Sequence, residues 1–423
     1  MRESVFFFLL CLSLTAPASG PVKIGVISDV HFLSQKLTSE SEALAAFERA
    51  TGRNILDLHE VLDSVLLDFQ KKEVDVLLIS GDLTNHGERQ SHIDLTEKLE
   101  RIRQSGTKVF VVPGNHDINV PDSKAYTGER AVSVESISSD EFAQRYAPFG
   151  YGDAFCRDTS SLSYAAEINE RTWLLCFDTN RYQDHTNTSI TGGRILPQTV
   201  QWAESILRLA RARNIAVLGM MHHGLVEHMP YQSDFFADYL IEEWQENAGI
   251  LADAGLKVVF TGHFHSNDIS LFTSPSGNTV YDVETASLAM YPFAYRTMQL
   301  IDGKLSIDTH FVTSVSGNPG LADQYRSQLE AVTRRVARSR IKGSGVSLPV
   351  ETEDALVKLI VMMQLMHVRG DEVPDDEIKS AVRSFAGLLD NEESDPDFLF
   401  DFPPADNRLV IDLGTTSSNV EKD

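Results

Sequence analysis

The sequence predicts an α/β protein in which strands and helices alternate along the first three hundred residues. Apolar runs typical of strands recur there, and several lack polar alternation, as expected for strands that are buried on both faces. Helical patterns lie between these runs. This alternation is typical of layered α/β folds, which bind their ligands beyond the carboxyl ends of the strands.

The expected elements follow one another along the chain. The strand-like runs are residues 22–28, 74–80, 108–112, 163–168, 172–178, 215–221, 256–261 and 279–284. The helical patterns are residues 54–72, 88–104, 197–213 and 237–254. The runs 163–168 and 172–178 predict an antiparallel hairpin. Two long segments without periodicity, 119–159 and 224–233, are either binding loops or decoration.

The composition changes near Gly317, where the pattern becomes helical. Helices are expected at residues 321–339, 353–369 and 375–390, followed by a strand at 408–413 and a Ser/Thr-rich tail. We therefore expect a main domain over residues 19–316 and a small helical C-terminal domain over 317–423. A substrate lid, a dimer face and a simple packing unit are all open for this domain, and the oligomeric state is open too.

The first eighteen residues have the pattern of a signal peptide. An apolar run over residues 5–14 is shorter than the roughly 20 residues of a membrane span. It is followed by the small–x–small pattern Ala16-Pro17-Ala18. We therefore expect an exported chain, periplasmic or secreted, with no membrane span after cleavage. Cys156 and Cys176 would remain in it, and the sequence leaves open whether they are bridged.

The charge of the chain excludes one class of partner. Lys and Arg number 37 against 61 Asp and Glu, a net charge of −24. Binding a nucleic-acid polymer through a basic surface needs the opposite balance, so we expect a small-molecule substrate instead. With three cysteines, the chain has neither a disulfide framework nor a Cys-rich zinc module.

Polar side chains follow five of the expected strands. The segments are Asp29-Val30-His31, Gly81-Asp82, Gly114-Asn115-His116-Asp117, His222-His223 and Gly262-His263-Phe264-His265. In an extended chain, residues i and i+2 point the same way, so Asp29 with His31, and His263 with His265, should each aim two groups at one place. Imidazole, carboxylate and carboxamide donors suit Mn, Fe, Co, Ni or Zn better than calcium. Seven such donors fit two ions that share a carboxylate.

These five motifs, DxH, GD, GNHD, HH and GHxH in this order, resemble the calcineurin-like metallophosphoesterase superfamily over about residues 22–312. Within it the chain is most similar to bacterial class III cyclic-nucleotide phosphodiesterases and their exported relatives with a C-terminal helical domain. The resemblance implies a four-layer α/β/β/α sandwich of two mixed sheets. Asn85 stands where purple acid phosphatases have a metal-binding Tyr, and Asn85-His86 replaces the Asp-Arg pair of protein Ser/Thr phosphatases, which disfavours both branches.

The resemblance also implies roles for individual residues. The implied metal ligands are Asp29, His31 and His265 for one ion, Asn115, His222 and His263 for the other, with Asp82 bridging them. His116 would face the phosphate and assist the leaving oxygen, and Asp117 would orient it. His223 is expected either on the substrate side or behind the ligands as their support, and Asn85 is expected on the substrate side. His86 and His228 lie beside motif loops and are further candidates for the pocket.

The expected function is hydrolysis of a small phosphodiester, such as a cyclic nucleotide, by attack of hydroxide held on two divalent ions, with Mn, Fe or Zn expected. A phosphomonoesterase or a nucleotide-sugar pyrophosphatase on the same site is the first alternative. A catalytically silent binding protein of the same fold is the second.

Overall fold

The computed structural model describes residues 20–343, 345, 347–373, 375–376, 378–380 and 402–414. The expected signal peptide over residues 1–18 lies outside the described residues. So does most of the helix expected over 375–390.

The first sheet contains six strands in the order β15-β14-β13-β1-β2-β3. They are β1 (Val22–Ile27), β2 (Val76–Ile79), β3 (Lys108–Val111), β13 (Ala294–Ile301), β14 (Lys304–Phe311) and β15 (Arg408–Asp412). β1, β2 and β3 run parallel, whereas β13, β14 and β15 join them as antiparallel neighbours. The sheet is therefore mixed, and its parallel half brings the carboxyl ends of β1, β2 and β3 to one edge.

The second sheet contains seven strands in the order β11-β12-β10-β9-β8-β7-β6. They are β6 (Ala154–Arg157), β7 (Tyr164–Asn169), β8 (Thr172–Cys176), β9 (Ala216–Met220), β10 (Val258–Thr261), β11 (Asp268–Thr273) and β12 (Thr279–Glu284). β8, β9, β10 and β12 are parallel, and β6, β7 and β11 are antiparallel to their neighbours. The expected hairpin of β7 and β8 is confirmed.

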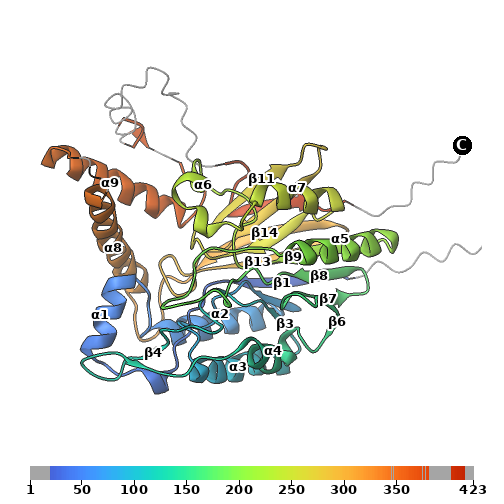
Figure 1. Cartoon of the computed structure of the whole chain (residues 1–423), viewed down its shortest axis with the longest axis horizontal. Helices are drawn as coiled ribbons and strands as arrows, with labels where there is room; N and C mark the ends of the chain where they lie inside the picture. Colours follow the sequence, from blue (N-terminus) through green and yellow to red (C-terminus); the bar gives the residue numbers. More distant parts are fainter. Residues whose placement is uncertain are drawn as a thin grey trace, which may run out of the picture.

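The two sheets pack face to face between two layers of helices. Leu174 and Cys176 of β8 belong to the core that also contains α2 (Leu58–Lys71) and α3 (Arg89–Gln104). Alternate residues Trp173 and Leu175 point the other way and pack against α5 (Pro197–Ala212) and α7 (Trp244–Ala254). Figure 1 shows α2 and α3 below the sheets and α5 and α7 above them. The predicted four-layer α/β/β/α arrangement is confirmed.

Segment 119–159 is more ordered than expected from its lack of periodicity. It contains β4 (Lys124–Ala125), β5 (Val132–Ser133), α4 (Ser139–Arg145) and the 3₁₀ turn η2 (Ala147–Phe149). The remaining short helices are η1 (Gln35–Leu37), α1 (Glu42–Thr51), α6 (Gln232–Phe235) and η3 (Ala237–Tyr239).

Among its described residues, the C-terminal part contributes two long helices and one strand. α8 (Leu321–Gly343) and α9 (Val350–His367) lie together at one end of the sandwich (Figure 1). β15 pairs with β14 and completes the edge of the first sheet. The sequence analysis placed residues 317–423 in a separate domain and did not predict that a strand of this part would join the main sheet. Within the described residues, no helix has the length and apolar character needed to cross a bilayer.

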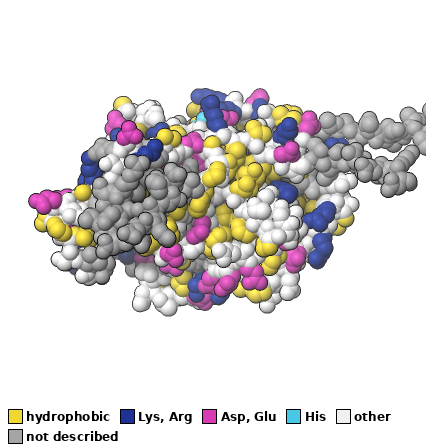
Figure 2. Space-filling view, turned by 90° about the horizontal axis from the view of Figure 1, so that it is seen from above, with side chains coloured by type: hydrophobic (Ala, Val, Ile, Leu, Met, Phe, Trp, Pro, Cys, Tyr) yellow, Lys and Arg dark blue, Asp and Glu magenta, His cyan; other side chains and the backbone are white. Residues whose placement is uncertain are grey.

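The surface carries charges of both signs. On the face drawn in Figure 2, acidic and basic side chains are interspersed around hydrophobic ones.

Cys156 and Cys176 are both free thiols, and Cys156 Sγ accepts a hydrogen bond from the indole of Trp202 at 3.3 Å. The bridge that the sequence left open is therefore absent between these two described residues.

Candidate metal centre

The side chains that follow the strand ends converge at one edge of the two sheets, on backbone of an unusual conformation. Asp29, His31, Asp82, His263 and His265 have φ angles of 49°, 44°, 47°, 74° and 63°. This left-handed region costs about 1–3 kcal/mol for a residue with a side chain and is typical of functional sites. The expectation that these residues lie in extended chain was wrong. Asp29 and His31 still face the same group of donors, whereas His263 and His265 face different groups.

The first group of donors consists of Asp29, His31 and His265. Asp29 Oδ1 lies 3.1 Å from His265 Nε2 and 3.9 Å from His31 Nε2, and the two imidazole nitrogens are 3.3 Å apart. Asp29 and His31 are fully buried, whereas His265 is partly exposed. One nitrogen or oxygen atom of each residue lies within 4.8 Å of the others, which is close enough to hold one ion.

The second group consists of His222, His263 and Asn115. Asn115 Oδ1 lies 3.2 Å from His222 Nε2. His222 and His263, together with Asp82, each place one donor atom within 4.8 Å of the others. His222 Nδ1 donates to the carbonyl of Ser80 at 2.9 Å, so its Nε2 is free to act as a metal ligand.

Asp82 lies between the two groups. Its Oδ2 is 3.6 Å from His31 Nε2, and its Oδ1 is 3.5 Å from His222 Nε2. Each carboxylate oxygen therefore faces a different group of imidazoles. This is the position expected for a residue that bridges two ions.

Two glycines allow the loops to approach one another. A side-chain carbon at Gly114 would overlap the backbone and the carboxylate of Asp82. At Gly262 it would overlap Ser28 and the carboxylate of Asp29. The motif glycines are thus required because the metal-binding loops touch there, independently of their φ angles.

The chemistry of these donors fits a pair of divalent cations. Burial lowers the pKa of His31, His222 and His263, which keeps each imidazole in the neutral form that binds metal. Burial, and then the negative charge of Asp29, raises the pKa of Asp82. Two nearby dications would offset this unfavourable burial of negative charge.

His116 lies beside this group and is partly buried. Its backbone N–H donates to Asp82 Oδ1 at 2.9 Å, its ring is 5.4 Å from that of His31, and it stacks on His86 at 4.9 Å. Burial, and then the Arg53 guanidinium, lowers the pKa of His116. Because a guanidinium can only donate, His116 Nε2 accepts from Arg53, and the proton of the neutral ring lies on the buried Nδ1.

Arg53 is a site residue that the sequence analysis missed. Its side chain is buried, and Nη2 lies 3.4 Å from His116 Nε2. Nη1 donates to the side-chain oxygen of Asn85 at 2.9 Å and to its backbone carbonyl at 3.2 Å. Arg53 stands alone in a loop after α1, with no motif around it, so only the fold reveals its place.

The structure changes the expected roles of Asp117 and Asn85 and selects one of the two that were open for His223. Asp117 accepts hydrogen bonds from the backbone N–H groups of Gly114, Leu83 and Thr84, and from the Thr84 hydroxyl. Its carboxylate therefore joins two loops and, within the described residues, makes no hydrogen bond to the His116 ring that it was expected to orient.

Asn85 was expected to contact substrate, and His223 either to contact substrate or to support the ligands from behind; both are fully buried. His223 donates from Nε2 to the carbonyl of Thr191 at 2.8 Å, and its Nδ1 lies 2.7 Å from the Thr179 hydroxyl. Its ring packs on that of His263 at 4.3 Å. The two residues therefore support His263 and Arg53 rather than contact a ligand.

Of the two further candidates for the pocket, His86 is beside His116 as expected, whereas His228 is buried among carboxylates of β11 and β12.

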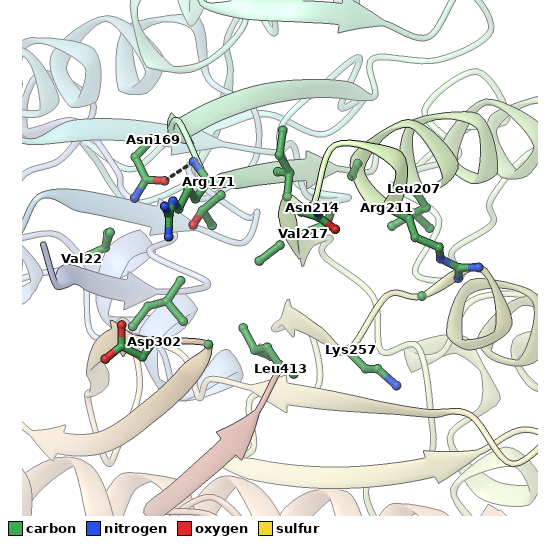
Figure 3. A pocket seen from close by; sticks show the side chains of 18 of the residues that line it. Val22, Asn169, Arg171, Leu207, Arg211, Asn214, Val217, Lys257, Asp302 and Leu413 are labelled. Carbon is green, nitrogen blue, oxygen red and sulfur yellow. Dashed lines mark hydrogen bonds between the residues drawn. The ribbon is translucent and has the colours of Figure 1, made fainter. Parts of the chain in front are cut away.

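A separate cavity of about 590 Å³ lies at the amino ends of β1, β8 and β9 (Figure 3). Its lining includes Arg171, Arg211 and Lys257. It is at the opposite edge of the sheets from the metal donors, so it is not part of their site.

Residues 22–267, more than half of the chain, match the protein family described as calcineurin-like phosphoesterase. The chain belongs to this family. The matched residues contain all five of the strand-end motifs.

Individual relatives are more distant. The chain is 29% identical over 104 residues to a 3',5'-cyclic-nucleotide phosphodiesterase from Nostoc sp.. The aligned segment covers 25% of this chain and 34% of the relative, so the chain spans about a third of that relative's length. A dimetal phosphatase from Danio rerio is 14% identical, with 69% of this chain and 96% of that chain covered at a TM-score of 0.46. A purple acid phosphatase from yellow lupin is 12% identical, with 69% and 52% covered at a TM-score of 0.44.

Proposed function

We propose that the protein is a dinuclear-metal phosphodiesterase that hydrolyses small phosphodiesters such as cyclic nucleotides. The observation that carries this proposal is the placement of Asp82 between two groups of donors, with Arg53 and His116 beside them. The activity in the name of the Nostoc relative supports a diester substrate.

The residues that would hold the ions are Asp29, His31 and His265 on one side and Asn115, His222 and His263 on the other, with Asp82 shared. When bound, two divalent cations supply charge that stabilises the phosphoryl oxygens and lowers the pKa of water at the site. Mn, Fe or Zn suits this mixture of nitrogen and oxygen donors.

The protein's own contribution lies in Arg53 and His116. The Arg53 guanidinium, held by Asn85, places a fixed positive charge beside His116 that could bind the phosphate. The His116 ring lies beside Asp82 and would assist the leaving oxygen once substrate displaces the contact of its Nε2 with Arg53, which is most valuable when that oxygen is a poorly stabilised ribose alkoxide. His86 stacks on the ring and limits its movement.

A substrate panel on the metal-loaded full chain tests the proposal. We expect hydrolysis of bis(4-nitrophenyl) phosphate and of 2',3'- or 3',5'-cyclic nucleotides. Asp82→Asn should lower both the metal content and kcat/KM, the latter by roughly 100-fold or more, because even supporting residues of metal ligands contribute about 10–100-fold. The surface variant Asp63→Asn is the matched control.

Three outcomes would contradict the proposal. Activity on monoesters alone would favour a phosphomonoesterase, and activity on nucleotide sugars alone a pyrophosphatase. A metal-loaded protein that hydrolyses none of the activated esters would favour a binding protein.

We also propose that the chain is exported. N-terminal sequencing of the mature protein should then show that it begins at residue 19.

A further inference from the structure

His263, a candidate ligand of the second ion, contacts a segment that lies outside the five motifs. The side chain is only 5% exposed, and its Nε2 lies 3.3 Å from the backbone carbonyl of Asp238. A carbonyl can only accept a hydrogen bond, so the proton of the neutral imidazole lies on Nε2. Nδ1 is then left without a proton and is the nitrogen that can bind the ion. The backbone at Asp238 therefore selects the tautomer of His263.

The residue after Asp238 packs on the same imidazole. The ring of Tyr239 lies 5.0 Å from that of His263 and 4.7 Å from that of Phe264. Phe264 stands between His263 and His265 in the sequence, so Tyr239 contacts the loop that carries both ligands. The hydrogen bond and the ring contact together restrict rotation of the imidazole. Residues 236–239 thus form a support segment for His263.

The support segment is attached at one end to the loop of His222. The N–H of Gly224 donates to the carbonyl of Tyr239, and the N–H of Ile241 donates to the carbonyl of Gly224, both at 3.1 Å. Gly224 comes two residues after His222. The end of the segment at Tyr239 is therefore fixed relative to another candidate ligand of the same ion.

The other end of the segment is held by the C-terminal part of the chain. The guanidinium of Arg340, near the end of α8, lies 5.0 Å from the centre of the Phe236 ring. This distance is typical of a cation–π contact. The Phe236 ring also lies 5.4 Å from that of Phe264 and 6.2 Å from that of Tyr239. A continuous set of contacts thus leads from α8 to the imidazole of His263.

We propose that Arg340 and Phe236 are positioning residues of the metal centre. Through them, α8 keeps the support segment against His263, so that Nδ1 of this imidazole faces the second ion. The inference rests on the proposed function, because it takes His263 as a metal ligand. It also goes beyond that function, because it makes the C-terminal helices necessary for a complete metal centre.

Metal binding by the full chain tests this role without measuring hydrolysis. Calorimetric titration of the metal-free protein with Zn²⁺ or Mn²⁺ should show two ions per chain for the wild type. Phe236→Ala should weaken the binding of one ion by about 10-fold and leave the other unchanged, because groups that support a metal ligand contribute about 10–100-fold. Arg340→Ala should weaken the same ion by roughly 3- to 10-fold, since a cation–π contact at an exposed site is weaker.

Matched variants separate this role from a general loss of structure. Phe236→Tyr keeps an aromatic ring and Arg340→Lys keeps a cation, so both should bind the two ions with nearly wild-type affinity. Phe235→Ala removes the neighbouring ring, which is 70% exposed, and Lys342→Ala removes an exposed cation from the same helix as Arg340. These two controls should leave both affinities unchanged.

The tautomer of His263 provides a second readout in the metal-free protein. Long-range ¹H–¹⁵N NMR correlations show which imidazole nitrogen carries the proton, and the spectrum of His263→Gln identifies the signal. We expect the Nε2–H form in the wild type and in Phe235→Ala, and a mixture of both forms in Phe236→Ala.

Equal affinities of the wild type, Phe236→Ala and Arg340→Ala for both ions would overturn the positioning role and leave the proposed hydrolysis intact. Equal weakening of both ions with a lower melting temperature would also overturn it, because that result indicates a general loss of structure. A wild-type chain that binds no pair of ions would reject the dinuclear centre on which the proposed function depends. The NMR result alone would then decide whether the segment supports His263.

Discussion

At the scale of single residues, Arg53 is the clearest case of a group whose place depends on the fold. Its Nη2 lies 3.4 Å from His116 Nε2, and its Nη1 donates a hydrogen bond to the side-chain oxygen of Asn85. Arg53→Ala should lower kcat/KM by about 100-fold, the size of effect found when one donor to a developing oxyanion is removed. Steady-state kinetics on a diester, with metal content measured in parallel, check this.

The control for that variant is Arg49→Ala, which removes an arginine that is more than half exposed and paired with Glu42. Its kinetics should match the wild type. If Arg53→Ala keeps full activity and full metal content, the proposed role of Arg53 in binding the phosphate is wrong.

The convergence of the candidate metal ligands could be predicted because these residues occur in short motifs directly after strands. Arg53 could not, since a lone arginine in a loop has no recognisable spacing. Asp117, His223 and Asn85 were correctly placed near the site, but their hydrogen bonds, which only the structure shows, give them supporting roles.

Glu88 leads to a prediction on pH. It is fully buried at the start of α3, and burial raises its pKa from near 4.5 to about 7. The folded state thus holds this proton more tightly than the unfolded state. Its contribution to stability is complete below about pH 4.5 and is lost as the pH rises through 7.

The variant Glu88→Gln should remove this part of the pH dependence. The difference in unfolding free energy between variant and wild type should grow in favour of the variant from pH 4.5 to pH 8, by on the order of 3 kcal/mol. Glu97→Gln, an exposed change on the same helix, should leave the profile unchanged. Parallel profiles for Glu88→Gln and the wild type would contradict the assignment.

At the scale of elements, the contact between loops predicts how two glycines differ. Gly114→Ala should reduce metal binding and lower the melting temperature, because the new methyl group would displace Asp82. Gly249 on α7 has open space around it, so Gly249→Ala should be stabilising by about 0.5–1 kcal/mol. Thermal unfolding and elemental analysis of the two variants distinguish them, and equal behaviour would refute a steric role for Gly114.

Buried strands and amphipathic helices were predictable because their apolar patterns are strong. β13 was missed although it alternates between buried and partly exposed residues. One of its buried positions is Arg296, which donates to backbone carbonyls of other segments. An arginine at a core position breaks the apolar pattern, so sequence reasoning cannot assign that strand.

At the scale of the whole molecule, β15 shows that the C-terminal part is joined to the main sheet. Ile411 of β15 is fully buried, whereas its neighbour Val410 is 60% exposed. Ile411→Ala should destabilise the whole protein by about 2 kcal/mol, and Val410→Ala by less than about 0.5 kcal/mol. Chemical denaturation measures both. A separate early transition in Ile411→Ala would instead indicate an independent C-terminal domain.

The pairing of β15 with β14 also constrains synthesis of the chain. On the ribosome, the segment up to Phe311 emerges well before Arg408–Asp412, so β14 must wait for its neighbour with a free edge. Free strand edges recruit other nascent chains and promote aggregation. Slow translation of the intervening helices would therefore lower the yield of native protein, and chaperones that shield such edges would raise it.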